Sequence, residues 1–273
     1  MVAEDAFFTF GGQKVRIRVV EPDIELKHRV FVISSPVTAA FNWRKLVPEL
    51  TQQGCLVVMM DLPGFGKSDC GADVSQDNSM HAGMGWGIVD EIDEAIGGGD
   101  STWHLMGHGV ACQTMLEMAN MHPDSVSSLI YVSPIMNTEN GIRTGFSSHS
   151  KWFDSNIASP QGYKSLMEKL FGRKIDDYVL DAMRAPFKRS GAKESFINML
   201  ARRTSPEPFK GFAPSLALWG EKDMLMDERT RAAFKKLAPE AEIHALKTAG
   251  HLPMETHSHA LRDFLRGWIK YVG

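Results

Sequence analysis

Short apolar runs alternate with segments of helical periodicity along most of this chain. Several runs are almost continuously apolar, which is typical of parallel strands covered on both faces. The predicted strands span residues 7–10, 14–20, 30–34, 55–61, 102–107, 129–133, 215–220 and 242–247. The first two flank Gly11-Gly12 and therefore predict an opening hairpin.

Apolar residues spaced three and four positions apart predict helices between these strands. The clearest stripe lies near the C-terminal end and consists of Leu261, Phe264, Leu265, Trp268 and Ile269. The predicted helices span residues 43–53, 88–96, 110–121, 228–237 and 258–271. Because strands and helices alternate, the pattern predicts an α/β fold with a doubly wound sheet.

One long segment breaks the alternation. Residues 137–212 contain no strand pattern and carry amphipathic pieces at 163–171, 175–183 and 192–201. The pieces are separated by the helix breakers Pro160, Gly172, Pro186, Gly191 and Pro206. We therefore expect residues 1–136 and 213–273 to form one core, and residues 137–212 to form a helical cap inserted into it.

Composition narrows the class of protein without naming a chemistry. The chain has 273 residues, 43% of them apolar, and a net charge of −3, which favours neither a nucleic-acid partner nor an anionic membrane surface. Its cysteines, Cys55, Cys70 and Cys112, have no disulfide or zinc spacing. With no signal-peptide pattern and no transmembrane run, we expect a cytoplasmic protein whose partner is a small molecule.

The most informative segment for chemistry is residues 103–112. A strand ending in Gly107-His108 is followed by a sharp turn and then at once by an apolar helix. This is the layout of a nucleophile elbow, in which a strained turn lifts one side chain above the sheet. The residue at that point is Gly109, which has no side chain and cannot act as a nucleophile.

With this segment the chain resembles the α/β-hydrolase family, in the branch of epoxide hydrolases, haloalkane dehalogenases and serine esterases. The resemblance runs over nearly the full length and rests on further motifs at residues 61–69, 121–134, 218–223 and 249–253. It implies a mostly parallel eight-stranded sheet flanked by helices. It also implies that Asp223 is the catalytic acid and His251 the base, in the order elbow, acid, histidine. In that chemistry histidine takes the nucleophile's proton, and the carboxylate fixes its tautomer.

The loop that supplies the oxyanion hole in this family departs from the usual pattern. Without a gap, Ser34-Ser35 matches the family's His-Gly, and Pro36 matches the residue whose N–H binds the oxyanion. Proline has no N–H. With a one-residue gap, Ser35 is the donor instead. The other donor, the N–H of Val110, is present under both alignments, and the sequence leaves the choice open.

Other residues near the predicted site have weaker roles. Cys112 is expected to face the core, and the ring of His108, a candidate binding residue, to point away from the pocket. Ser34 or Ser35 could approach the site from the oxyanion loop. Possible pocket-lining residues are Met136, Met224 and Met254. The glycines at 83–87 do not form a dinucleotide loop, so we expect no cofactor, and the histidines near 251 do not form a metal site.

Three functions fit these observations. The first is an enzyme in which the His251–Asp223 dyad acts as a general base on a largely apolar acyl or carbonyl compound, as a hydrolase, lyase or cyclase. The second is a non-catalytic relative that binds a ligand or partner. The third is an ordinary serine hydrolase whose serine was replaced by Gly109. The retained acid and base favour the first.

Overall fold

The computed structural model describes residues 3–99, 101–136, 146–201 and 206–272, and an eight-stranded sheet forms its centre. The strand order is β1-β2-β4-β3-β5-β6-β7-β8. Strands β3 to β8 run parallel, while β1 and β2 are antiparallel to their neighbours. The strands are β1 (Ala3–Phe10), β2 (Gln13–Val20), β3 (His28–Ser34), β4 (Cys55–Asp61), β5 (Trp103–His108), β6 (Val126–Val132), β7 (Ser215–Gly220) and β8 (Glu242–Leu246). The predicted mostly parallel sheet and the opening hairpin are confirmed.

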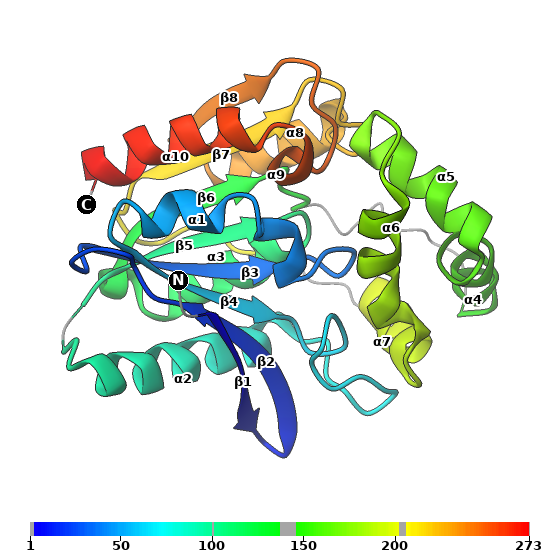
Figure 1. Cartoon of the computed structure of the whole chain (residues 1–273), viewed down its shortest axis with the longest axis horizontal. Coiled ribbons are helices and arrows are strands. Elements are labelled where there is room, and N and C mark those ends of the chain that lie inside the picture. Colours follow the sequence, from blue (N-terminus) through cyan, green and yellow to red (C-terminus); the bar gives the residue numbers. More distant parts are fainter. Residues whose placement is uncertain (1–2, 100, 137–145, 202–205, 273) are drawn as a thin grey trace.

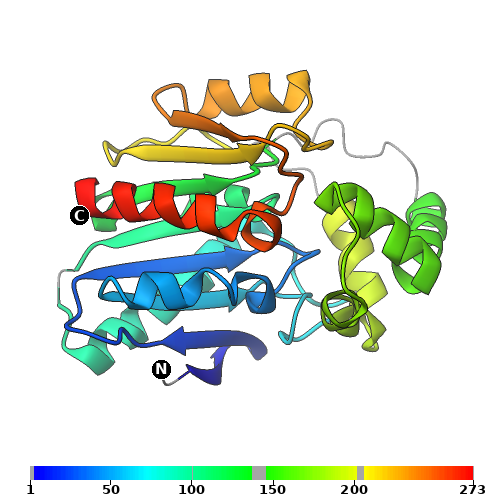
Figure 2. The same cartoon turned by 45° about the horizontal axis from the view of Figure 1, so that its top comes forward.

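Helices cover both faces of the sheet, as the alternating pattern predicts. In Figure 2, α1 and α10 lie in front of the sheet, and α2 and α3 lie behind it. The core helices are α1 (Val47–Thr51), α2 (Asn78–Ile96), α3 (Ala111–Met121), α8 (Glu228–Leu237), α9 (Pro253–Thr256) and α10 (Ser258–Val272), with the short turns η1 (Ala40–Trp43) and η2 (Pro123–Ser125).

Burial explains why the apolar runs become central strands. Every residue of β4 and of β5 is buried. Each fully buried large aliphatic side chain contributes about 1.5–3 kcal/mol relative to exposure. On α10, Leu261, Leu265 and Ile269 are at most 1% exposed, so the predicted stripe is the face that packs on the sheet. The parallel centre is therefore rigid and fixes where its strands end.

Two predicted helix boundaries were wrong. Helix α2 begins at Asn78, ten residues before the predicted start, because the Asp77 carboxylate caps it by accepting a bond from the Met80 N–H (3.0 Å). Burial of its residues Met84 and Trp86 outweighs the low helix propensity of the glycines there. The predicted helix at 43–53 is shorter: η1 ends at Trp43, and α1 spans only Val47–Thr51.

A cluster of helices lies beyond the carboxyl ends of the parallel strands (Figure 1). It comprises α4 (Phe146–Phe153), α5 (Pro160–Phe171), α6 (Asp177–Arg184) and α7 (Ala192–Ala201), with the short turns η3 (Asp154–Ala158) and η4 (Ala185–Lys188). Three of these helices were predicted from sequence, and α4 was not. Residues 137–145 and 202–205 of the predicted cap lie outside the described residues, and the domain boundaries at 136/137 and 212/213 stay a prediction.

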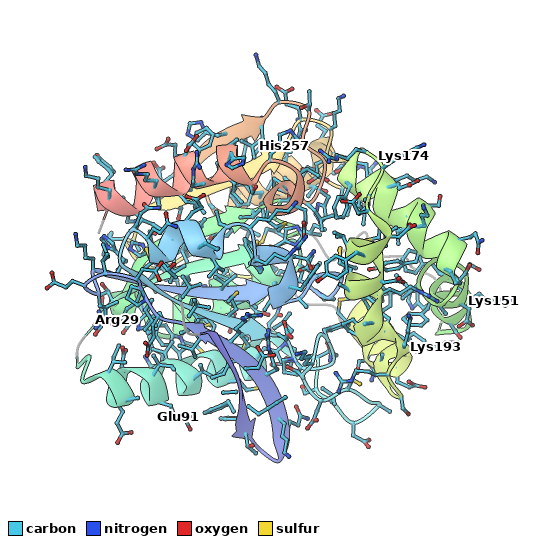
Figure 3. All side chains as sticks on the ribbon, viewed as in Figure 1. Arg29, Glu91, Lys151, Lys174, Lys193 and His257 are labelled. Atoms are coloured by element: carbon cyan, nitrogen blue, oxygen red, sulfur yellow. The ribbon has the colours of Figure 1, made fainter. Side chains whose placement is uncertain are left out.

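Aromatic side chains form the interior of this helical cluster. The Trp152 and Phe196 rings are stacked with centroids 5.8 Å apart, and Phe153 lies 5.4 Å from Phe196. Charged groups lie outside: Figure 3 shows Lys151 and Lys193 on the side away from the sheet. The cluster thus has an apolar centre of its own. Among the described residues, no helix has the length and hydropathy needed to cross a membrane.

One buried carboxylate ties two loops at the carboxyl end of the sheet together. Glu255, in α9, has a side chain only 1% exposed and pairs with the Arg44 guanidinium through both oxygens. Its Oε1 also accepts a bond from Asn42 Nδ2 (3.0 Å), and its backbone oxygen accepts one from Lys45 Nζ (2.8 Å). The segment after β3 is therefore fixed to the segment after β8.

Replacing Glu255 is expected to destabilise the fold. Glu255→Ala leaves Arg44 and Asn42 without their partner, and we expect the free energy of unfolding to fall by about 2–3 kcal/mol. Glu255→Gln keeps the bond to Asn42 and should lose less. Urea unfolding with Glu94→Ala as an exposed control measures both; equal stability of Glu255→Ala and the control contradicts the assigned role.

Candidate active site

The predicted strand–turn–helix layout is present between β5 and α3. Gly109 has φ +56°, the left-handed conformation that glycine adopts without strain. Its N–H donates to the Val132 carbonyl, and its own carbonyl accepts from the Ile135 N–H, both at 3.0 Å. These bonds hold the turn against the end of the neighbouring strand β6. The backbone of residue 109 is therefore held at the carboxyl edge of the sheet.

The predicted acid and base lie next to each other. Asp223 follows β7 and His251 follows β8, and these neighbouring parallel strands end at the same edge of the sheet. His251 Nδ1 lies 2.9 Å from Asp223 Oδ2, and the two side chains are 1% and 0% exposed. The other carboxylate oxygen, Oδ1, accepts a bond from the Leu225 N–H (2.9 Å). The carboxylate is thus oriented on both sides.

The ionisation of Asp223 suits this role. Burial raises the pKa of its carboxyl, but the hydrogen bond and charge of His251 lower it, as do the Leu225 N–H and the Ser133 side chain. The lowering effects outweigh burial, so the pKa of Asp223 lies below its usual value. Asp223 is therefore an anion at neutral pH and can accept the Nδ1 proton of His251.

The backbone of His251 is held by two other parts of the chain. Its N–H donates to the carbonyl of Leu170 in α5 (2.7 Å), and its carbonyl lies 2.9 Å from His108 Nε2. The His108 and His251 rings lie 4.8 Å apart. Burial lowers the pKa of His108 to about 3, with the charge of His251 acting in the same direction, so His108 is neutral and donates from Nε2.

Ser35 and His251 face the position where a side chain at residue 109 would lie. A Cβ on Gly109 would be 3.2 Å from Ser35 Oγ, 3.5 Å from His251 Nε2 and 3.6 Å from Ser35 Cβ. Ser35 is buried, and its carbonyl accepts bonds from the Thr38 N–H (2.8 Å) and hydroxyl (3.1 Å). Ser35 rather than Pro36 supplies the nearest atoms, although which N–H binds an oxyanion stays open.

The remaining predicted residues are divided between the interior and the surface. Val110 precedes α3, so its N–H lies at the positive end of that helix. Pro36, Met136 and Met254 are buried, whereas Met224 is 55% exposed; pocket lining by these methionines stays a prediction. Cys112 is fully buried, as expected, and burial raises the pKa of its thiol.

Sequence reasoning missed residues that support the pair. Ser133 was predicted to end a strand, but it follows β6 with φ +45° and contributes to the low pKa of Asp223. The adjacency of β6 and β7 could have indicated that contact. Leu170 acts through its backbone, and no sequence signal marks a carbonyl. Within the described residues, no cluster of three or more histidine, cysteine, aspartate or glutamate side chains is arranged to hold a metal ion.

Residues 34–264, most of the chain, match the family described as the alpha/beta hydrolase family. The chain belongs to the alpha/beta hydrolase family. The assignment of Gly109 to the family's elbow, and of Asp223 and His251 to its acid and base, stays a prediction. This family membership confirms the resemblance drawn from the sequence motifs.

Curated relatives and solved structures agree with this assignment. The hydrolase YugF of Bacillus subtilis (strain 168) is 22% identical over 246 residues, covering 86% of this chain and 87% of that protein. The 2-hydroxy-6-oxononadienedioate/2-hydroxy-6-oxononatrienedioate hydrolase 2 of Pseudomonas putida is 24% identical over 290 residues, covering 94% and 95%. The haloalkane dehalogenase DbeA from Bradyrhizobium elkani USDA94 has the same fold, with a TM-score of 0.70, 17% identity and 99% of both chains covered.

A cavity of about 340 Å³ lies between the inserted helices and the core, near the loop that carries Ser35. Its apolar lining includes Phe41 and Pro186, whereas basic side chains come from both sides of the cavity. They are Arg16, Arg18, Lys67 and Arg189. Asp61 also lines it, and Asp5 pairs with Arg16, Arg18 and Lys67, so the four basic side chains outnumber these two carboxylates beside a partly apolar wall.

Acid is expected to destabilise this fold through two buried histidines. Burial lowers the pKa of His104 to about 4 and that of His108 to about 3, against 6.5 in the unfolded chain. Below pH 6.5 the unfolded state therefore binds protons that the native state does not, and stability falls until the native pKa is reached. Between pH 7 and pH 5 we expect a loss of ~2 kcal/mol per histidine.

Urea unfolding at pH 7, 6 and 5 measures this loss. His108→Gln retains a donor for the His251 carbonyl but does not titrate, so its stability should fall about half as steeply with pH. An equally steep fall in His108→Gln and the unchanged protein contradicts the assignment.

Proposed function

We propose that this protein is an enzyme in which His251, paired with Asp223, acts as a general base on a small acyl or carbonyl compound. In this proposal residue 109 supplies no nucleophile, and the reacting atoms lie above Gly109. The observation that supports it most directly is the buried 2.9 Å contact between His251 Nδ1 and Asp223 Oδ2, with Nε2 facing the space at residue 109.

The tautomer of His251 follows from that contact. Because Asp223 is an anion, it accepts the proton on Nδ1, which leaves the lone pair on Nε2. A general base must lie within hydrogen-bond reach of the proton that it removes, and the space above Gly109 meets this requirement. The proton donor is then a substrate group or a water molecule rather than a serine hydroxyl.

The start of α3 supplies the complementary electrostatics. The Val110 N–H lies at the positive end of an eleven-residue helix, next to residue 109. A carbonyl oxygen placed there gains negative charge when the base acts, and such a donor stabilises that charge. The base and the proposed oxyanion donor therefore both lie beside residue 109, which suits a carbonyl substrate.

The cavity and the relatives' names favour a carbonyl compound with an apolar body and an acidic group. The Pseudomonas putida relative is named for a keto compound with two carboxylates. Guanidinium groups bind carboxylates through charge-assisted bonds. In this chain, Arg18 and Arg189 line the cavity beside the apolar Phe41 and Pro186. We infer that this cavity holds the acidic group of the substrate.

A second candidate function is ligand binding without turnover, because Gly109 removes the nucleophile that the family's hydrolases use. The two functions differ in whether a reaction depends on His251. The third possibility, an ordinary serine hydrolase whose serine was replaced by Gly109, differs from the first because turnover would then require Gly109→Ser, and from the second because that variant would be active.

Removing the base is expected to abolish most turnover. A positioned general base contributes about 10²–10⁴-fold, so His251→Ala should lower kcat by at least ~10²-fold on the best substrate in a panel of esters and diketones. Asp223→Asn should lower kcat less. His257 is partly exposed, and His257→Ala should leave kcat unchanged. Equal turnover by His251→Ala and the unchanged protein contradicts the proposal. If no compound in the panel is turned over, ligand binding is favoured instead.

The acidic group is tested with a matched substrate pair. For the 4-nitrophenyl monoester of succinic acid, Arg18→Ala should raise KM about 10-fold through the loss of one charge-assisted bond, while KM for 4-nitrophenyl butyrate should stay constant. An equal change in KM for both esters, or an unchanged KM for both, contradicts the assignment of the cavity.

A further inference from the structure

We infer that the nucleophile of this enzyme is a water molecule bound between the Ser35 hydroxyl and His251 Nε2, in the volume that a side chain at residue 109 would fill. The inference rests on the proposed function and narrows it to direct hydrolysis, without an acyl-enzyme. It assigns Ser35 a catalytic role, because its hydroxyl contacts the reacting water.

The geometry at Gly109 supports a bound oxygen atom. The point occupied by a Cβ at residue 109 lies 3.2 Å from Ser35 Oγ and 3.5 Å from His251 Nε2. Hydrogen bonds to a hydroxyl and to an imidazole nitrogen are about 2.5–3.2 Å long. That point lies about 1.5 Å from the Gly109 Cα, so a water oxygen lies roughly 2 Å farther from the backbone, at contact distance from that carbon. There it occupies the space that Ser35 Oγ and His251 Nε2 flank. Two different polar groups thus converge on one small volume.

The backbone of Ser35 is held in place by its loop. Ser35 is 3% exposed, and its carbonyl accepts two bonds from Thr38 immediately after β3 ends. β3 pairs with β5, the strand that leads to Gly109, so the loop and the turn share one edge of the sheet. The preceding Ser34 has a hydroxyl that is buried without a hydrogen-bond partner among the described residues. It is not among the atoms nearest residue 109.

The hydrolytic step balances with these groups alone. His251 Nε2 takes one proton from the water, while the second O–H of the water donates to Ser35 Oγ. The water oxygen forms a bond to the carbonyl carbon, and the electron pair of the C=O bond moves to the oxygen near the Val110 N–H. The C=O bond then re-forms, the bond to the leaving group breaks, and the imidazolium gives its proton to that group. The products are a carboxylic acid and the protonated leaving group.

Glycine at residue 109 is what makes room for this water. A Cβ there lies only about 2 Å from the proposed oxygen atom, well inside contact distance, and the left-handed φ of +56° also disfavours other residues. Gly109→Ala therefore blocks the water without supplying a nucleophile. Gly109→Ser blocks it as well, but places a hydroxyl beside His251, as in the family's serine enzymes.

The test compares neighbouring serines. On the ester or diketone that is turned over best, Ser35→Ala should lower kcat at least 10-fold with KM changed less than 2-fold, and Ser35→Thr, which keeps the hydroxyl, should retain more activity. Ser34→Ala is the matched control and should stay within 2-fold. Gly109→Ala should lose at least 10-fold. Far-ultraviolet circular dichroism and thermal unfolding confirm that each variant is folded.

Covalent chemistry provides the second readout. With a fluorophosphonate probe and intact-mass spectrometry, the unchanged protein should remain unlabelled and show no burst of 4-nitrophenol, whereas Gly109→Ser should gain one adduct. A burst or an adduct in the unchanged protein, equal activity of Ser35→Ala and Ser34→Ala, or hydrolysis of no substrate in the panel overturns the inference. If His251→Ala is inactive while Ser35→Ala is not, the bound water is disproved but the general base stands.

Discussion

The hydrogen bond between His251 and Asp223 depends on the pairing of β7 with β8, and most of what the site can do depends on that bond. Both residues leave their strands at the same edge of the sheet, in loops that follow neighbouring parallel strands. Burying a carboxylate costs several kcal/mol unless it is paired and hydrogen-bonded. Here the histidine and a backbone N–H compensate for that cost, so the carboxylate stays ionised and oriented in the interior.

The surrounding contacts fix the position of this pair. His108 and Leu170 hold the backbone of His251 from two sides, and Glu255 joins the same region to the segment after β3. Ser35 belongs to that second segment. The distance between the serine hydroxyl and the imidazole is therefore set by a network that spans β3, β5 and β8. A site assembled from several strand ends keeps its geometry because the central strands are fully buried.

Much of this could be predicted from sequence. The continuous apolar runs located the central strands, and the family resemblance of the motifs singled out Gly109, Asp223 and His251, which the fold brings together. The misplaced start of α2 shows the limit of local reasoning: glycine propensity argued against a helix that the Asp77 cap and the burial of Trp86 stabilise. The contact of Ser35 with residue 109 depends on the path of a loop, which composition and periodicity do not encode. Contacts made by a backbone carbonyl, such as that of Leu170, cannot be predicted from residue type, because every residue has a carbonyl.

The bond from the His251 N–H to the Leu170 carbonyl has an evolutionary consequence. Helix α5 belongs to the cluster beyond the carboxyl ends of the strands, yet its last turn helps to position His251. Since any residue supplies a carbonyl, this constraint acts on the length and ending of the helix and not on its side chains. Substitutions within α5 are then tolerated more readily than insertions or deletions, which would move the carbonyl away from the histidine.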